Sequence, residues 1–145
     1  MRNLRFAVEY DGTEFSGWQV QPGLRTVQGT LEDALGVVLG EPVRVRGAGR
    51  TDAGCHARGQ VANARTGSAA ACDRVLRSLA SLLPQDVAVH EVREAPLGFD
   101  ARRGAVERRY EYRLLLAPRR SCAALPGIPG SAPIAPSCKT RWRRS

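Results

Sequence analysis

One loop of the sequence carries residues that could perform nucleophilic chemistry. Residues 47–57 read GAGRTDAGCHA, which places Arg50 and Asp52 two residues apart among glycines. Glycines let a backbone approach a ligand closely, a nearby guanidinium keeps a carboxylate ionised, and an ionised carboxylate in a cleft is a usable nucleophile. On residue types alone, an Arg50–Asp52 ion pair that only fixes the loop is the simpler interpretation, because structural ion pairs also perturb carboxylates.

Other kinds of site are not indicated. The loop lacks the GxxxxGK[ST] pattern of a phosphate-binding loop. No two cysteines have CxxC spacing, and the two histidines are far apart in sequence, so we predict no metal site and expect free thiols. The residues concerned are Cys55, Cys72, Cys122, Cys138, His56 and His90.

The elements that must position this loop can be read from the periodicity of apolar residues. Apolar residues at positions 4, 6, 8 and 10 alternate as in a half-buried strand, whereas those between residues 27 and 39 fall on one helical face. The same reasoning predicts strands at 43–45, 60–64, 87–92 and 105–116, and a second helix at 75–83. The order β-α-β-β-α-β-β predicts an α+β fold, with helices on one face of a mainly antiparallel sheet. A ferredoxin-like or RRM-like split βαβ arrangement is the nearest common architecture.

The basic residues are concentrated towards the C-terminal end. The net charge is +8, of which residues 1–100 contribute −1 and residues 101–145 contribute +9. Such an end attracts phosphate, although a solubilising tail would look the same. Residues 118–145 contain five of the nine prolines and no acidic residue, so we expect them to be disordered.

Five motifs, in order, resemble TruA-type tRNA pseudouridine synthases. They are YDGTEFSGWQ at 10–19, TVQ at 26–28, GRTDAG at 49–54 followed by HA and GQV, LPQDVAV at 83–89, and FDAR at 99–102 leading to RRYEY at 108–112. The resemblance covers about residues 3–117 and identifies that range as the N-terminal catalytic half. It departs from the family at Cys55, Ala80 and Arg103, where valine, asparagine and phenylalanine are usual.

The resemblance implies a reaction and roles for three residues. Uridine would be isomerised to pseudouridine at positions 38–40 of the tRNA anticodon arm, without a cofactor or a metal. Asp52 would be the catalytic aspartate, acting at the ribose or at the base. Arg50 would hold the flipped nucleotide and pair with that aspartate, and Tyr110 would lie against the target base. The family acts as a homodimer on the tRNA anticodon stem-loop.

Two alternatives to an active enzyme remain open. The family has a second half that completes the sheet and the cleft, and its motifs are not found here, so for this chain alone we favour an inactive remnant. Residues 118–145 also resemble out-of-frame translation of a GC-rich gene. The other alternative, a non-catalytic RRM-like RNA-binding module, is weaker because the aromatic pattern of an RRM is absent. No segment resembles a signal peptide or a membrane helix, so we expect a cytoplasmic protein with no membrane contact.

Overall fold

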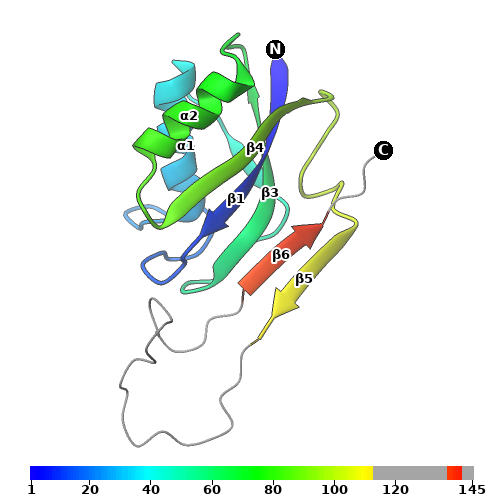
Figure 1. The fold of residues 1–145 in the computed structure, drawn as a ribbon. Coiled ribbons are helices and arrows are strands. Elements are labelled where there is room, and N and C mark those ends of the chain that lie inside the picture. Colours follow the sequence, from blue (N-terminus) through cyan, green and yellow to red (C-terminus); the bar gives the residue numbers. More distant parts are fainter. Residues whose placement is uncertain (113–136, 142–145) are drawn as a thin grey trace, which may run out of the picture.

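The computed structural model describes residues 1–112 and the backbone of residues 137–141. In these parts the elements follow the predicted order, with one further strand (Figure 1). They are β1 (Arg2–Tyr10), α1 (Val27–Leu39), β2 (Val45–Gly47), β3 (His56–Thr66), α2 (Cys72–Leu82), β4 (Val87–Ala95), β5 (Glu107–Glu111) and β6 (Ser137–Arg141). None of the helices described there is long and apolar enough to cross a bilayer.

The sheet has the expected antiparallel core. β1 pairs with β4 on one side and with β3 on the other, and β2 pairs with the C-terminal half of β3, all antiparallel. The strand order β4-β1-β3-β2 with a helix in each crossover is the split βαβ arrangement. The α+β prediction is therefore confirmed. Because β1 ends where its antiparallel neighbour β3 begins, the loop after β1 and the loop before β3 meet at one end of the sheet.

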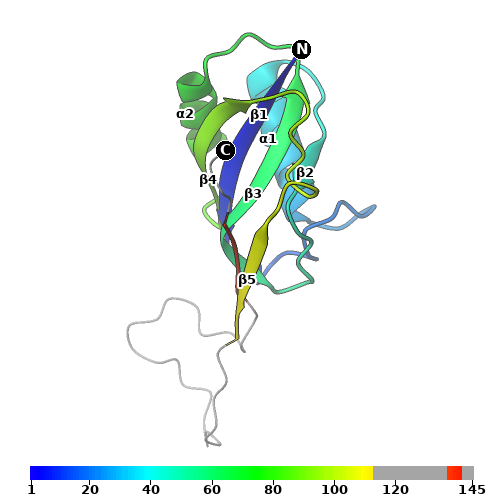
Figure 2. The same cartoon turned by 90° about the vertical axis from the view of Figure 1, so that its right-hand side faces the viewer.

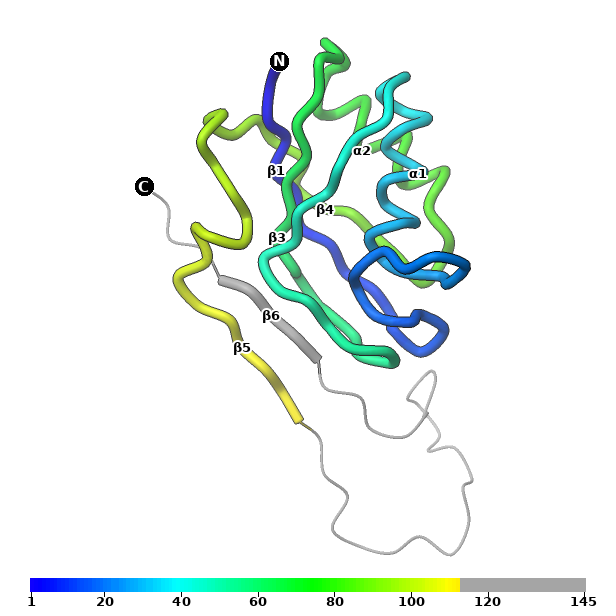
Figure 3. Tube along the Cα trace, turned by 180° about the vertical axis from the view of Figure 1, so that it is seen from behind, coloured from blue at the N-terminus to red at the C-terminus, as the bar shows by residue number. Residues whose placement is uncertain are grey.

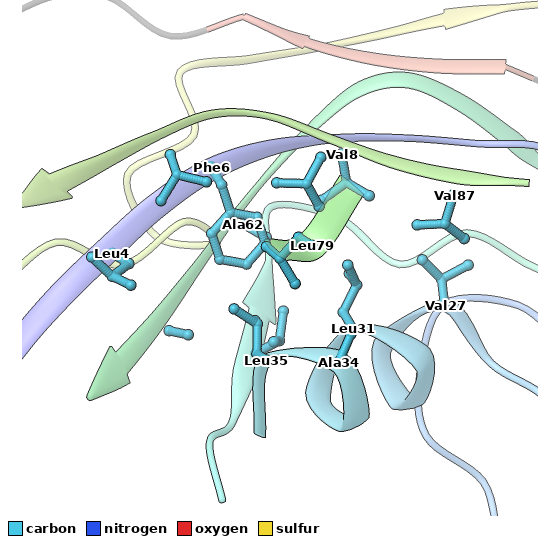
Figure 4. Packing of buried hydrophobic residues seen from close by; sticks show 14 of the residues in the cluster. Leu4, Phe6, Val8, Val27, Leu31, Ala34, Leu35, Ala62, Leu79 and Val87 are labelled. Carbon is cyan, nitrogen blue, oxygen red and sulfur yellow. The ribbon is translucent and has the colours of Figure 1, made fainter. Parts of the chain in front are cut away.

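Both helices cover the same face of the sheet, where they bury the main core (Figure 4). The alternating side chains of β1, such as Leu4, Phe6 and Val8, are at most 1% exposed. They pack against α1 residues such as Leu31 and Leu35. This burial follows from matched periodicities: every second residue of the strand and every third or fourth residue of the helix face the same layer.

The first helix begins and ends where its flanking residues predict. The Oγ1 of Thr26 accepts a hydrogen bond from the N–H of Gly29 at 3.3 Å, which satisfies one of the free donors of the first turn. At the other end Gly40 has φ +73° and its N–H donates to Gly36 O, which is the left-handed ending that glycine favours.

Part of the opposite face of the sheet, over β3 and the start of β1, is covered by the segment between β4 and β5 (Figure 2). Two buried asparagines hold this segment. Asn63 of β3 accepts the N–H of Ala101 at 2.9 Å and donates to the side chain of Asn3 at 3.0 Å. Asn3 of β1 in turn donates to the carbonyls of Pro96 and Phe99. Buried amides of this kind are tolerated because each has partners.

The strand β6 differs from the sequence-based expectation for residues 118–145. Ser137–Arg141 pairs parallel with the start of β3 and antiparallel with β5. Since β2 occupies only residues 62–64 of β3, the edge of β3 at residues 56–59 is open for pairing. Backbone pairing of an open edge needs no side-chain periodicity, so the sequence pattern could not indicate it. The rest of that segment, and the predicted strand residues 113–116, lie outside the described residues.

We predict that Asn63→Ala destabilises the chain and loosens the segment that Asn63 holds. The variant leaves the Ala101 N–H and part of the Asn3 amide without partners, and each buried unsatisfied group costs about 1–3 kcal/mol. We expect denaturant unfolding to show a loss of about 2–3 kcal/mol.

The control is Gln85→Ala, at an exposed position before β4. Its side chain makes no hydrogen bond within residues 1–112, so the change should stay within about 0.5 kcal/mol. Equal stability of the Asn63 variant and the original chain would contradict this account of the segment.

Candidate functional site

The loop that carries Asp52 runs from the end of β2 to the start of β3 and is held by backbone hydrogen bonds on both sides of Asp52. The N–H of Trp18 donates to the carbonyl of Thr51 at 2.9 Å. The N–H of Gly54 donates to the carbonyl of Phe15 at 3.2 Å. Both partners belong to the loop after β1, which lies beside the Asp52 loop (Figure 3). The backbone around Asp52 is thus fixed, while its side chain is exposed.

The two loops fit closely because one contact residue has no side chain. A Cβ atom at Gly12 would lie 1.9 Å from the carbonyl oxygen of Cys55, so only glycine allows this approach. Beside it, the hydroxyls of Tyr10 and Thr51 lie 2.7 Å apart and form a hydrogen bond. Burial raises the pKa of the Cys55 thiol, which keeps this neighbour of Asp52 protonated.

His56, the first residue of β3, lies at the junction of the two loops. Its Nδ1 accepts the N–H of Gly12 at 3.2 Å and lies 3.0 Å from Oδ1 of Asp11. Two hydrogen bonds from Thr13, first from its hydroxyl and then from its N–H, lower the pKa of Asp11. A charged Asp11 therefore helps to order the turn after β1.

Arg50 and Tyr110 meet at an open hollow of about 700 Å³, which we call the first hollow. It is lined by Ala48, Gly49, Arg50, Arg102, Arg103, Arg108 and Tyr110. The side chain of Tyr110 is 52% exposed, so a face of its ring can meet a ligand. Asp52 is not one of the lining residues, although it follows Arg50 by two positions.

The predicted pairing of Arg50 with Asp52 is not observed. Within residues 1–112 these two side chains form no ion pair with each other. The loop is therefore shaped by its hydrogen bonds to the loop after β1 rather than by a local ion pair. Both side chains are exposed at the same end of the sheet, where either can meet a ligand.

A turn centred on Asp100 delivers two more arginines to the first hollow. One carboxylate oxygen of Asp100 accepts the N–H groups of Arg102 and Arg103 at 2.9 and 3.0 Å, and the other pairs with Arg46 at 2.9 Å. The backbone bond from Arg103 is the largest cause of the lowered pKa of Asp100, with Arg46 contributing. The carboxylate thus fixes the turn and leaves the side chains of Arg102 and Arg103 exposed.

Arg108 of β5 joins three segments at the edge of the first hollow. Its Nε donates to the carbonyl of Ala48 at 2.9 Å, and its Nη2 donates to the carbonyl of Arg102 at 3.0 Å. These bonds connect the Asp52 loop, the Asp100 turn and β5. The guanidinium of Arg108 is therefore already engaged with the backbone.

In the described part of the chain, no group of three or more His, Cys, Asp or Glu residues could hold a metal ion. The arrangement instead combines an exposed carboxylate, exposed guanidinium groups and a phenol ring. Such a set can attract a polyanion, stack a planar base and present a nucleophile.

Comparison with known proteins decides the family. A family model described as tRNA pseudouridine synthase matches residues 6–102. The chain belongs to the tRNA pseudouridine synthase family. Proteins named tRNA pseudouridine synthase A are 52% identical over 119 residues in Chlorobium limicola and 46% identical over 121 residues in Geotalea uraniireducens. These alignments cover 81% and 83% of this chain but 49% and 50% of the relatives, so the chain spans about half the length of the curated relatives it matches.

Sequence reasoning missed two residues of this synthase-family site. Arg103 was noted only as a departure from the family, although it lines the first hollow. Gln60 of β3 was noted only as part of a motif, yet it is fully buried, and both polar atoms of its amide lack a hydrogen-bond partner in the described part of the chain. A Cβ atom at Gly49 would lie 3.6 Å from Oε1 of Gln60, so this amide lies directly beneath the Asp52 loop. The sequence signals that could have indicated these residues were an arginine pair after a turn and a glutamine inside an apolar strand.

We predict that Asp100→Asn destabilises the chain at neutral pH but not in acid. The folded-state pKa of Asp100 lies below its ordinary value of 3.8, so its charge stabilises the fold above that value. This stabilisation is lost as the pH falls through the lowered folded-state pKa. Denaturant unfolding at pH 7 should show a loss of about 1–2 kcal/mol, and the difference should shrink towards zero as the pH is lowered through and below that pKa.

Asp33→Asn, at an exposed position of α1 without an ion pair in residues 1–112, provides the matched loss of one charge and should change little at either pH. A deficit of the Asp100 variant that persists unchanged in acid would show that the carboxylate charge is not what holds the turn.

We also predict that Gln60→Met stabilises the free chain. A buried amide without partners costs about 1–3 kcal/mol, and methionine has a similar volume without that cost. Thermal and denaturant unfolding should therefore show a gain of about 1 kcal/mol. A loss of stability would instead mean that the Gln60 amide is satisfied in solution.

Proposed function

We propose that this protein acts as a tRNA pseudouridine synthase and that Asp52 is its catalytic aspartate. The observation that carries the proposal is the exposed carboxylate of Asp52 on a loop fixed by hydrogen bonds on both sides, next to a hollow with Arg50 and Tyr110 in its wall. A rigid backbone is what a nucleophile requires, because small displacements of a reacting group reduce rates strongly.

The reaction is an isomerisation, and its atoms balance without a co-reactant. The N1–C1′ glycosidic bond of uridine breaks, the uracil turns, and C5 forms the new bond to C1′. The proton on C5 is released and N1 gains one, so no redox partner is needed. Asp52 would attack the ribose or the base, and either attack requires a charged carboxylate.

The target nucleotide must leave its stack before Asp52 can reach it. Unstacking costs a few kcal/mol, and the first hollow offers two compensating contacts. The ring of Tyr110 can stack on the extruded uracil, which contributes about 1–3 kcal/mol. Arg50 can hold the phosphate or the ribose of the same nucleotide. At about 700 Å³, the hollow lies within the usual size range of ligand sites.

The finer parts of the proposal rest on the family resemblance. We place the target uridines at positions 38–40 of the anticodon arm, the partner as the tRNA anticodon stem-loop, the assembly as a homodimer and the location as the cytoplasm. Activity is proposed for the whole protein, because the chain spans about half the length of its relatives. The competing proposal is that the 145-residue chain alone is inactive.

Tritium release separates these proposals. With tRNA that carries uridine labelled at C5, an active protein releases tritium as the C5 proton is lost, whereas an inactive fragment releases none. Asp52→Asn should lower that rate by at least about 10³-fold, which corresponds to ~4 kcal/mol of transition-state stabilisation. Asp33→Asn, an equal change at an exposed site of α1, should retain the original rate.

Each contrary result has a separate meaning. Release that persists in Asp52→Asn would remove Asp52 from the nucleophile's role. No release by the unsubstituted chain, in a preparation that is folded, would favour the inactive fragment.

A further inference from the structure

A second hollow lies next to the first and has no role in the reaction described above. It has a volume of about 330 Å³ and lies along β2, between Trp18 and the Asp100 turn. Arg50, Arg102 and Arg103 line both hollows, whereas Arg46 lines only the second. The two hollows are therefore adjacent sites that share cationic walls.

The charges around the second hollow are unbalanced. Four arginines line it, and the carboxylate among its lining residues, Asp100, is already paired with Arg46. The side chains of Arg50, Arg102 and Arg103 have no carboxylate partner among residues 1–112. Some other arginines in that range are paired with carboxylates, as in Arg25–Asp86 and Arg44–Glu32. A concentration of unmatched guanidinium groups favours an anion, and guanidinium groups suit phosphate particularly well.

These arginines differ in how firmly the structure holds them. Arg46 is held by its ion pair with Asp100, and the same carboxylate fixes the backbone of Arg102 and Arg103. The turn is therefore ordered before any ligand arrives, while the side chains of Arg102 and Arg103 remain exposed. An ordered turn lowers the entropy cost of binding.

We propose that the second hollow binds the phosphodiester that flanks the target uridine, with Arg103 as its principal contact. This inference rests on the proposed function, because the first hollow must then hold the extruded nucleotide. Arg102 and Arg103 line both hollows. They therefore lie where a backbone phosphate would join a nucleotide in the first hollow to its neighbour in the chain. The RNA strand accordingly runs from the first hollow, past the Asp100 turn, to the edge of β2.

Binding of a short RNA hairpin with one loop uridine tests this at several salt concentrations. Arg103→Ala should weaken binding about 10-fold and reduce the salt slope by about 0.7, the value for one lost single-strand phosphate contact. Arg77→Ala, which removes an exposed arginine from α2 on the helix side of the sheet, should leave both quantities unchanged. Thermal unfolding of both variants should match that of the original chain, since neither side chain makes a hydrogen bond or an ion pair within residues 1–112.

Uncharged backbone linkages in the RNA show which phosphate Arg103 contacts. A methylphosphonate is placed in turn on either side of the loop uridine, and binding by the original chain is compared with binding by Arg103→Ala. At one of these linkages the methylphosphonate should weaken binding by the original chain. With the methylphosphonate at that linkage, Arg103→Ala should cause no further loss of affinity. The same loss from Arg103→Ala at both flanking linkages would overturn the proposal, as would equal effects of the Arg103 and Arg77 variants.

Inorganic phosphate distinguishes a free anion from the RNA backbone. If phosphate competes in an Arg103-dependent way while neutral linkages have no effect, the hollow holds a free anion and the proposal is wrong. No measurable RNA binding by the original chain would also overturn it. These binding measurements are separable from the chemistry. If Arg103→Ala and the neutral linkage act independently while tritium release still depends on Asp52, only this inference is contradicted. If the two are coupled but tritium release does not depend on Asp52, only the proposed function is contradicted.

Discussion

The structure of the site depends on the contact between the loop after β1 and the loop that carries Asp52. Antiparallel pairing of β1 with β3 brings the two loops to one end of the sheet. Gly12 then lets them approach to the distance of backbone contact, and the hydrogen bonds at Thr51 and Gly54 hold the segment around Asp52. Within residues 1–112 Asp52 has no ion pair to orient it, so the accuracy of its position comes from this backbone contact and hence from the register of two strands.

A second constraint acts on the opposite face of the sheet. Burying two asparagines in neighbouring strands is costly unless each amide finds partners. Asn3 and Asn63 find them in each other and in the backbone of the segment after β4. This network places the Asp100 turn, and the turn places Arg102 and Arg103. The arginines of the hollows are therefore positioned by polar groups within the sheet rather than by the helix-side core.

The sequence predicted elements whose side chains carry a periodic signal and missed those positioned by polar contacts. The alternation in β1 and the Thr26 and Gly40 ends of α1 were readable, because burial and capping act on local patterns. Asn3 and Asn63 look like solvent-facing strand residues, since the segment that covers them has no periodicity of its own. Within the last predicted strand, residues 105–116, the structure has β5 over Glu107–Glu111. Asp52, Arg50 and Tyr110 came from the family resemblance, and their roles remain predictions.

The distribution of charge explains how a carboxylate nucleophile could work on a polyanion. An exposed aspartate repels RNA, and the excess of basic residues after position 100 would not by itself offset this at Asp52. Folding brings Arg46 and Arg50, from the nearly neutral first part of the chain, beside Arg102 and Arg103. Meanwhile carboxylates such as Asp86, Glu32 and Glu94 are paired with arginines at other edges. In the proposed complex, these arginines would draw the phosphates to the hollows, and the carboxylate of Asp52 would approach an extruded uridine whose phosphate charge is balanced by arginine.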